Sequence, residues 1–261
     1  MREIAVVVQN ENEQCSVEET IYAIKNAGFK NVFIQWYDEV WEYSQEKQVN
    51  LCKKLGLNII FAHLGYQTMN SIWEEGIEGE ELVERYKKNI KECKENGIDL
   101  VIMHLTRKFE APMYGEIGLN RIRKIVEYAE QMNVKIAFEN TKIRGYLEYV
   151  FNNIKSDNIG LCYDIGHDHV HFNDELDLAN YKDRIFAIHL HDNDQSDDQH
   201  LLPFDGTINW DSAIKKIKEN NYNGPVTLEI CYRGEYLKQT VEEFYKKGYE
   251  IGNKILEMFE N

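Results

Sequence analysis

The sequence predicts an α/β protein folded as one (β/α)8 TIM barrel, and three observations support this prediction. Short runs of β-branched and aliphatic residues alternate with amphipathic helical stretches along the whole chain, without hairpin signals between them. Strand and helix can alternate throughout only if the strands are parallel. The chain has 261 residues, 43% of them hydrophobic, and no Ser/Gly-rich or charged linker divides it. We therefore expect a single barrel domain over residues 1–261.

Eight strands and eight helices can be placed in order. The first strand is Ile4–Val8, and the helix after it begins at Ser16, because Ser16 and Glu19 have capping-box spacing, and runs to about Ala27. The later strands are Asn31–Trp36, Asn58–His63, Ile98–His104, Val134–Glu139, Ile159–Asp164, a seventh that starts at Ile185 and ends at His189, and Val226–Ile230. The later helices are Ser44–Leu55, Glu80–Glu95, about Ile117–Met132, about Tyr146–Ile154, a short one around Asp177–Tyr181 after a histidine-rich loop, Trp210–Glu219, and a long terminal helix beyond Glu235.

The seventh strand runs directly into side chains that bind metals. It ends in His189-Leu190-His191-Asp192-Asn193-Asp194, and Asp198-Gln199-His200 follows shortly after. A buried strand needs no imidazole at its end for packing, whereas divalent cations prefer His and Asp at short spacing as ligands. We expect His191 on the opposite side of the sheet from His189 unless the strand has ended, so His191 is not among the predicted ligands. The segment therefore predicts a metal site that includes His189.

Most of the other predicted strands end in the same way. The terminal or near-terminal polar residues are His63, His104, Glu139, Asp164, His189 and Glu229. In a barrel, the carboxyl ends of all strands face one mouth, where active sites are built. One buried His or Glu is more often a satisfied core residue than a ligand. Six such residues at one mouth, however, would form an unpaired cluster unless a cation lies among them.

Composition excludes several classes of function. The formal net charge is −15, from 45 acidic and 30 basic residues. This charge repels nucleic acid unless a basic patch opposes it, and the sequence shows none. The N-terminal run Met1–Val8 has no small-residue cleavage site, no apolar stretch reaches the length of a membrane span, and the five cysteines lack paired spacing. We expect a cytoplasmic protein with a small-molecule partner and without nucleic acid or membrane partners; whether it forms a homo-oligomer stays open.

Four motifs together resemble the xylose-isomerase-like TIM barrel superfamily. They are Phe138-Glu139-Asn140-Thr141, Cys162-Tyr163-Asp164-Ile165-Gly166-His167, His189-Leu190-His191-Asp192, and Asp198-Gln199-His200 with a following Gly206. The superfamily includes sugar phosphate isomerases and epimerases, and the endonuclease IV group of AP endonucleases (family 2). The resemblance covers essentially the whole chain, and its motifs are specific only in combination.

The resemblance implies a set of metal ligands. It implies one divalent ion, which is Mn, Zn, Co or Mg, held by Glu139, Asp164, His189 and Glu229. The endonuclease branch adds two zinc ions, one held by His63 and His104 with Glu139 bridging, and one held by His167, Asp198 and His200. All nine positions match in this chain, so the binding of more than one zinc ion stays an open alternative.

Charge favours the sugar branch over the nuclease branch. An enzyme that acts at abasic DNA needs basic residues at its mouth and loops that enter the minor groove. Here the loop Asp192–Asp197 is strongly acidic, and the candidate phosphate contacts are Arg107, Lys108, Lys142, Arg144 and Arg233. Ketose epimerases of the superfamily place an arginine shortly after the seventh-strand histidine, and this chain has none there. The segment Asp192–Trp210 is similar to uncharacterised isomerase- and epimerase-like proteins.

The predicted reaction is isomerisation or epimerisation of a sugar, or of a sugar phosphate, by proton transfer next to a metal-bound carbonyl. Glu139 and Glu229 are the expected catalytic residues, and His167 is expected to bind a substrate hydroxyl or a second ion. The expected substrate contacts are Trp36, Tyr66 and Arg107. Two alternatives stay open, an endonuclease IV-like zinc phosphodiesterase and a metal-dependent dehydratase of the dehydroshikimate dehydratase type.

Overall fold

Eight parallel strands form the barrel in the computed structural model, which describes residues 2–9, 14–37 and 44–260. The strands are β1 (Ile4–Val8), β2 (Asn31–Trp36), β3 (Asn58–Leu64), β4 (Leu100–Met103), β5 (Lys135–Glu139), β6 (Ile159–Asp164), β7 (Ile185–His189) and β8 (Val226–Leu228). Each strand pairs with its sequence neighbour from β1 to β7, and β8 pairs with β1. A bridge between Leu190 and Leu228 joins β7 to β8 and closes the barrel. The predicted parallel barrel is confirmed.

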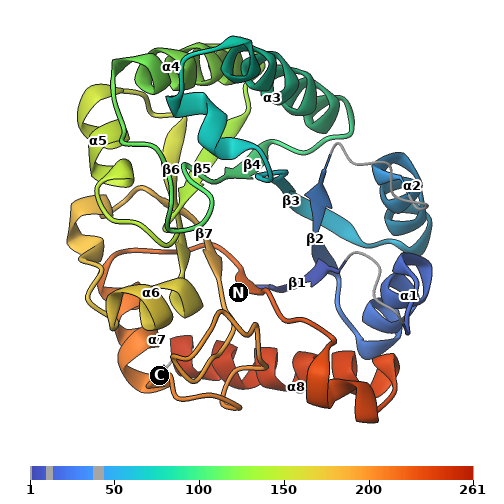
Figure 1. Ribbon diagram of the computed structural model, residues 1–261. Helices are drawn as coiled ribbons and strands as arrows, with labels where there is room; N and C mark the ends of the chain where they lie inside the picture. Colours follow the sequence, from blue (N-terminus) through green and yellow to red (C-terminus); the bar gives the residue numbers. More distant parts are fainter. Residues whose placement is uncertain (1, 10–13, 38–43, 261) are drawn as a thin grey trace.

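A ring of helices surrounds the strands (Figure 1). The helices are α1 (Val17–Ala27), α2 (Gln45–Leu55), α3 (Ile77–Glu95), α4 (Glu116–Gln131), α5 (Tyr146–Asn153), α6 (Ile165–Phe172), α7 (Trp210–Glu219) and α8 (Val241–Glu260), with short 3-10 turns η1 (Met69–Trp73), η2 (Leu178–Tyr181) and η3 (Gly234–Lys238). Ser16 and Glu19 form the capping box that the sequence predicts for α1. Helix α8 packs against α1, so the last helix of the chain lies beside the first and completes the ring.

The apolar core has two parts. The larger part lies between the strands and the helices, and it includes the inner faces of α1, α3 and α4. The smaller part fills the inside of the barrel and contains Val7, Phe33, Phe61, Ile102, Ala137, Cys162 and Ala187. The ring of Phe33 stacks on Phe61 and on His189, with ring centroids 4.6 and 5.2 Å apart. This interior cluster therefore forms the floor on which His189 rests.

The histidine-rich segment after β6 is a helix, where the sequence predicted a loop. Helix α6 begins immediately after Asp164, whose carboxylate accepts a hydrogen bond from the His167 backbone N–H at 2.7 Å. Asp164 thus ends a strand and caps a helix at once, because an aspartate carboxylate satisfies the free amides of a first turn. The helix ends at Asn173, which adopts the left-handed conformation (φ 52°). This placement holds His167 close to β6.

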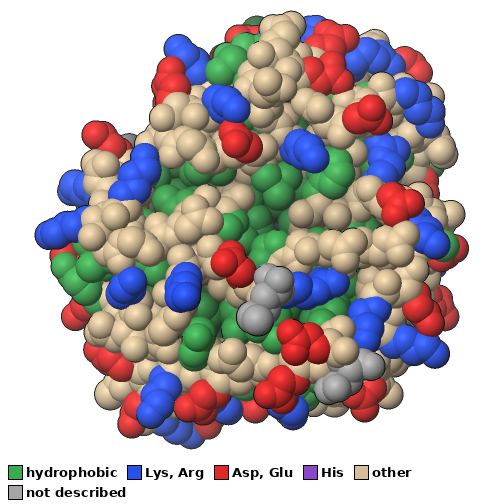
Figure 2. Space-filling view, turned by 180° about the vertical axis from the view of Figure 1, so that it is seen from behind, with side chains coloured by type: hydrophobic (Ala, Val, Ile, Leu, Met, Phe, Trp, Pro, Cys, Tyr) green, Lys and Arg blue, Asp and Glu red, His purple; other side chains and the backbone are tan. Residues whose placement is uncertain are grey.

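The opposite end of the molecule has a different character. Figure 2 shows the face behind the view of Figure 1, where acidic and basic side chains intermingle around an apolar centre. No histidine of the described residues is visible on this face. The histidines gather elsewhere, as the strand-end pattern predicts.

Candidate metal centre

The strand-end side chains converge on one cavity of about 580 Å³. Glu139, Asp164 and His189 end β5, β6 and β7, while His104 and Glu229 lie one residue beyond β4 and β8. Among the predicted ligands, those that line the cavity are His63, His104, Glu139, His167, Asp198, His200 and Glu229. The other two, Asp164 and His189, are fully buried close to them. The barrel therefore brings together all nine predicted positions.

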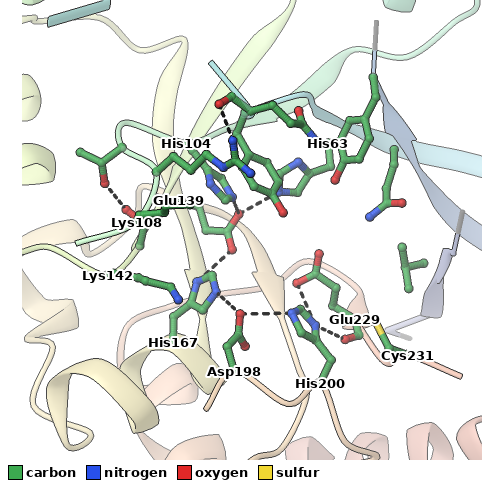
Figure 3. Close-up of a pocket in the computed structure, with 18 of the residues that line it drawn as sticks. His63, His104, Lys108, Glu139, Lys142, His167, Asp198, His200, Glu229 and Cys231 are labelled. Atoms are coloured by element: carbon green, nitrogen blue, oxygen red, sulfur yellow. Dashed lines mark hydrogen bonds and ion pairs between the residues drawn. The ribbon is translucent and has the colours of Figure 1, made fainter. Parts of the chain in front are cut away.

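Glu139 is the hub of the cluster (Figure 3). Its Oε2 lies 3.0 Å from Nε2 of His63 and 3.0 Å from Nε2 of His104. Its Oε1 lies 3.2 Å from Nδ1 of His167 and 3.4 Å from Nδ1 of His189. One carboxylate thus faces four imidazoles, which is the position of a bridging ligand between neighbouring ions.

His189 lies in the middle of three carboxylates without a hydrogen bond to any of them. Its Nδ1 is 3.3 Å from Glu229, 3.4 Å from Glu139 and 3.8 Å from Asp164. The ring is completely buried, and neither nitrogen has a hydrogen-bond partner among the described residues. Such an unpaired buried imidazole is costly and rare. A divalent cation between the ring and the carboxylates would remove this cost, so these four side chains fit the implied ion.

Three histidines of the cluster share one orientation. His63 Nδ1 lies 3.0 Å from the backbone carbonyl of the next residue. The Nδ1 atoms of His167 and His200 lie 2.9 and 2.8 Å from the carbonyls of Asn140 and Glu229. A carbonyl only accepts, so each Nδ1 carries the proton and each Nε2 is directed at a carboxylate. This orientation by a backbone carbonyl is typical of metal-binding histidines.

Contacts within the cluster hold the Glu139 carboxylate ionised. Burial lowers the pKa of the His167 imidazole, but the negative charges of Asp164 and Asp198 outweigh burial and hold that pKa well above its usual value. Burial raises the pKa of the Glu139 carboxyl, but its contacts with the imidazoles of His104 and His189 outweigh burial and hold that pKa well below its usual value. Positive charge is therefore needed beside these carboxylates, and either protonated imidazoles or a divalent cation supplies it.

The donor atoms form several overlapping groups. One group consists of His63, His104 and Glu139, and another of His191, Asp198 and His200; within each group the ligand atoms lie within 4.8 Å of one another. Asp198 Oδ2 lies 3.1 Å from His167 Nε2 and 3.3 Å from His200 Nε2. The buried donors are consistent with a divalent metal site, and their number leaves room for more than one ion.

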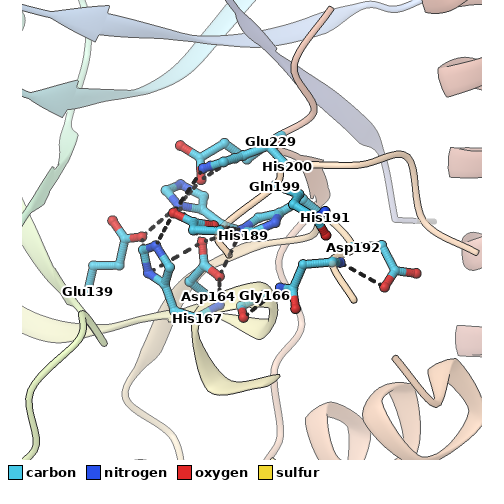
Figure 4. A network of polar contacts seen from close by, with 12 residues as sticks. Glu139, Asp164, Gly166, His167, His189, His191, Asp192, Gln199, His200 and Glu229 are labelled. Atoms are coloured by element: carbon cyan, nitrogen blue, oxygen red, sulfur yellow. Dashed lines mark hydrogen bonds and ion pairs between the residues drawn. The ribbon is translucent and has the colours of Figure 1, made fainter. Parts of the chain in front are cut away.

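His191 belongs to the cluster, which corrects the expectation that it faces away (Figure 4). Its Nε2 lies 3.1 Å from Asp164, and its ring stacks on His200 at 4.0 Å. Residues two apart along a strand share one face, so His191 lies on the same side as His189, and the expectation that it faces away was wrong. A side chain at Gly166 would come within 1.9 Å of the His191 ring, so only glycine fits beside it.

The expected substrate contacts lie in two different places. Tyr66 and Arg107 line the cavity, and the Tyr66 ring stacks on His104 at 4.1 Å. Trp36 does not line it, which is a correction: its indole N–H donates to Glu92 of α3 at 3.2 Å, outside the barrel. Successive residues of a strand point to opposite faces, so the inward position here belongs to the neighbouring Gln35.

A buried carboxylate that the sequence did not single out fixes the loop after β7. Asp192 is fully buried and accepts hydrogen bonds from the backbone N–H groups of Asn193, Phe204 and Ile208 at 2.9, 2.9 and 3.2 Å, and from the indole of Trp210 at 2.8 Å. These bonds tie the start of the loop to its end, and the loop carries Asp198 and His200 between them. Asp192 and Trp210 are 18 residues apart in the sequence, so no local sequence pattern predicts this contact.

We expect Asp192→Ala to lower the free energy of unfolding by roughly 3 kcal/mol or more, because it leaves several buried donors without an acceptor. Urea unfolding followed by circular dichroism measures this change. Asp194→Ala is the matched control, because Asp194 lies on the same loop, is exposed and bonds only local groups. Equal unfolding midpoints for the two variants would contradict the role given to Asp192.

Known proteins resemble this chain over most of its length. A family model described as a xylose isomerase-like TIM barrel matches residues 21–250. An inosose isomerase of Halalkalibacterium halodurans is 26% identical over 268 residues, which cover 93% of this chain and 90% of that protein. A solved structure of a D-tagatose 3-epimerase-like protein superposes with a TM-score of 0.74 at 22% identity, covering 99% of this chain and 98% of that one, and this likeness concerns the fold.

A third relative matches a shorter segment. An uncharacterised protein of Sinorhizobium fredii is 32% identical over 149 residues, which are 56% of this chain and 46% of that protein. The chain thus spans about half the length of that curated relative. Among the helices of the described residues, none combines the length and the apolar character needed to cross a membrane.

Proposed function

This chain belongs to the xylose isomerase-like TIM barrel family, and we propose that it is a divalent-metal-dependent isomerase or epimerase of a small sugar or polyol. One observation carries the proposal: two carboxylates, Glu139 and Glu229, lie within 3.4 Å of the same nitrogen of a buried imidazole, His189, beside a cavity large enough to hold a sugar. The similarity to an inosose isomerase over 93% of the chain supports it.

The chemistry proposed is proton transfer at a carbon next to a carbonyl. A divalent ion held by Glu139, Asp164, His189 and Glu229 would polarise that carbonyl and stabilise the negative charge that develops on its oxygen. One of the two glutamates accepts the proton, and the other returns a proton from a different position. Because Glu139 ends β5 and Glu229 follows β8, the two carboxylates reach the cavity from different strands, which suits the two faces of one carbon or two neighbouring carbons.

A second candidate function has its own supporting observation. The groups His63, His104 and Glu139, and His167, Asp198 and His200, are assembled as an endonuclease IV-like zinc phosphodiesterase would require. Against it stands the net charge of −15, which opposes the approach of a DNA duplex. A dehydratase would use the same proton abstraction, with a hydroxide leaving afterwards.

Exchange of substrate hydrogen with solvent tests the proposal. In D2O, metal-loaded protein is incubated with a panel of ketoses, aldoses, their phosphate esters and polyol ketones, and carbon-bound deuterium is measured by NMR and mass spectrometry. We expect deuterium at the carbon next to the carbonyl, together with an isomer or epimer. Loss of water without exchange into a recovered sugar would favour the dehydratase, and nicking of abasic duplex DNA would favour the nuclease.

A further inference from the structure

Four basic side chains line the same cavity as the metal-binding cluster. Two of them follow β4, one follows β5 and one follows β8, and they are Arg107, Lys108, Lys142 and Arg233. The carboxylates that line the cavity are the three that belong to the cluster. Among the described residues that line this cavity, cations therefore outnumber carboxylates, although the chain as a whole carries a net charge of −15.

These four cations have no carboxylate partner within the described part of the chain. Arg144 gives the contrast: it was a candidate phosphate contact in the sequence, but it lies outside the cavity and pairs with Glu175 at 3.4 Å. Four cations gathered around one opening, without a carboxylate partner among the described residues, create a positive potential that attracts an anionic ligand.

Arg107 is positioned by neutral groups. Its Nη1 donates to the backbone carbonyl of Gln67 at 2.7 Å. The side chain of Asn70 holds the backbone of Arg107. It accepts a hydrogen bond from the Arg107 N–H at 2.7 Å and donates one to the Arg107 carbonyl at 2.9 Å. The guanidinium is thus fixed at the cavity while its charge stays uncompensated, which is the arrangement that recognises an anion with little ordering cost.

Lys142 and Arg233 are held in a similar way. The Lys142 amine lies 5.4 Å from the centre of the Phe109 ring, and in Figure 3 it extends toward His167. Lys142 is half-buried, so its unpaired charge costs more than that of a free surface lysine. Arg233 donates to the backbone carbonyl of Asp198 at 2.9 Å. Both side chains therefore direct positive charge at the cavity without meeting a counter-charge.

We propose, on the basis of the isomerase or epimerase function above, that the substrate carries an anionic group, a phosphate ester or a carboxylate, which binds Arg107 and Lys142 at the mouth of the cavity. Lys108 and Arg233 add positive charge around it. The sugar end then lies over Glu139 and Glu229, and the anionic end lies on the loops after β4 and β5. The cations surround a cavity rather than follow a track across the surface, so the site fits a small anion and not a polynucleotide.

Matched substrate pairs test this inference in the deuterium-exchange assay. The pairs are a ketohexose with its 6-phosphate, and the same ketohexose with a ketohexuronate. We expect kcat/KM to be roughly 10- to 100-fold higher for the anionic member of at least one pair, since charge-assisted hydrogen bonds contribute at that level. Preference for the phosphate identifies a phosphate ester as the substrate group, and preference for the uronate identifies a carboxylate.

Variants show whether the named residues cause the preference. Arg107→Gln and Lys142→Gln are each expected to reduce the anionic-to-neutral ratio of kcat/KM about tenfold. The Lys142→Arg variant keeps the positive charge, so we expect it to keep most of the preference for the anionic substrate. Arg123→Gln on α4 and Lys182→Gln before β7 are the matched controls, because neither side chain lines the cavity, and their ratios should equal that of the parent protein.

Calorimetry separates failure of this inference from failure of the proposed function. Binding of the phosphate ester and of the uronate is measured on metal-loaded Glu229→Gln protein, with and without Arg107→Gln. Equal turnover of neutral and anionic substrates, or a ratio that Arg107→Gln and Lys142→Gln leave unchanged, would overturn the anionic site and leave the isomerase in place. Absence of exchange with every sugar, together with binding of an anion that depends on Arg107, would overturn the isomerase and keep the anionic site.

Discussion

Glu139→Gln and Glu229→Gln are each expected to lower turnover by at least about a thousandfold while the barrel stays folded. General acid–base catalysis contributes on the order of 10²- to 10⁴-fold, and each substitution also removes a charged ligand of the implied ion. The amide keeps the size of the carboxylate but accepts no proton. The measurements are deuterium exchange into substrate, metal content and far-ultraviolet circular dichroism.

The geometry makes the Glu139 variant the stronger test. Its two oxygens contact four histidines, whereas Glu229 contacts His189 and His200. We therefore expect Glu139→Gln to reduce metal content as well as turnover. Glu95→Gln, at the exposed end of α3, is the control for a charge change outside the cavity. Wild-type turnover in either cavity variant would show that the carboxylate roles are misassigned.

The barrel could be predicted because its signals are local. Runs such as Ile4–Val8 and Ile159–Asp164 were bounded correctly to the residue, since a buried parallel strand is continuously apolar and stops at a polar residue. Strand ends in a barrel share one mouth whatever the loops do. The convergence of His63, His104 and Glu139 therefore followed from the fold class, without any knowledge of their distances.

The remaining features depend on contacts between distant segments. His191 joins the cluster because residues two apart on a strand share one side, and the later segment that carries Asp198 and His200 packs against it. Helix α6 forms because Asp164 caps it, while its histidines suggested a loop. Asp192 is satisfied by groups that lie up to 18 residues later.

The net charge of the sequence and the charge around the cavity lead to different conclusions about ligands. A count over the whole chain gives a strongly acidic protein, and this count led to the expectation that nucleic acid is repelled. The fold places four of the five candidate phosphate contacts on one cavity, without a carboxylate partner among the described residues. A net charge describes the approach of a large polyanion, whereas binding of a small anion depends on the few cations at one opening.

Removal of bound metal is expected to abolish turnover and to lower the melting temperature by roughly 5–10 °C. Free ion at about 100 times its dissociation constant stabilises a fold by about 2.7 kcal/mol, and each kcal/mol corresponds to roughly 2–4 °C for a chain near this size. The physical reason is that Glu139, Asp164 and Glu229 are buried side by side around His189. Differential scanning calorimetry before and after chelation, and after addition of Mn, Zn, Co or Mg, measures the change.

Metal analysis of protein purified without chelators decides between one ion and three. We expect one equivalent held tightly and a second below full occupancy, because both nitrogens of the buried His189 ring lack a hydrogen bond while three carboxylates lie around it. The double variant His63→Ala/His200→Ala should keep the first equivalent, since Glu139, Asp164, His189 and Glu229 remain. His169→Gln is the control, because its ring nitrogens contact Asp174 and Thr207 instead. Three equivalents of zinc that fall to one in the double variant, with nicking of abasic DNA by the parent protein, would replace the isomerase by the endonuclease.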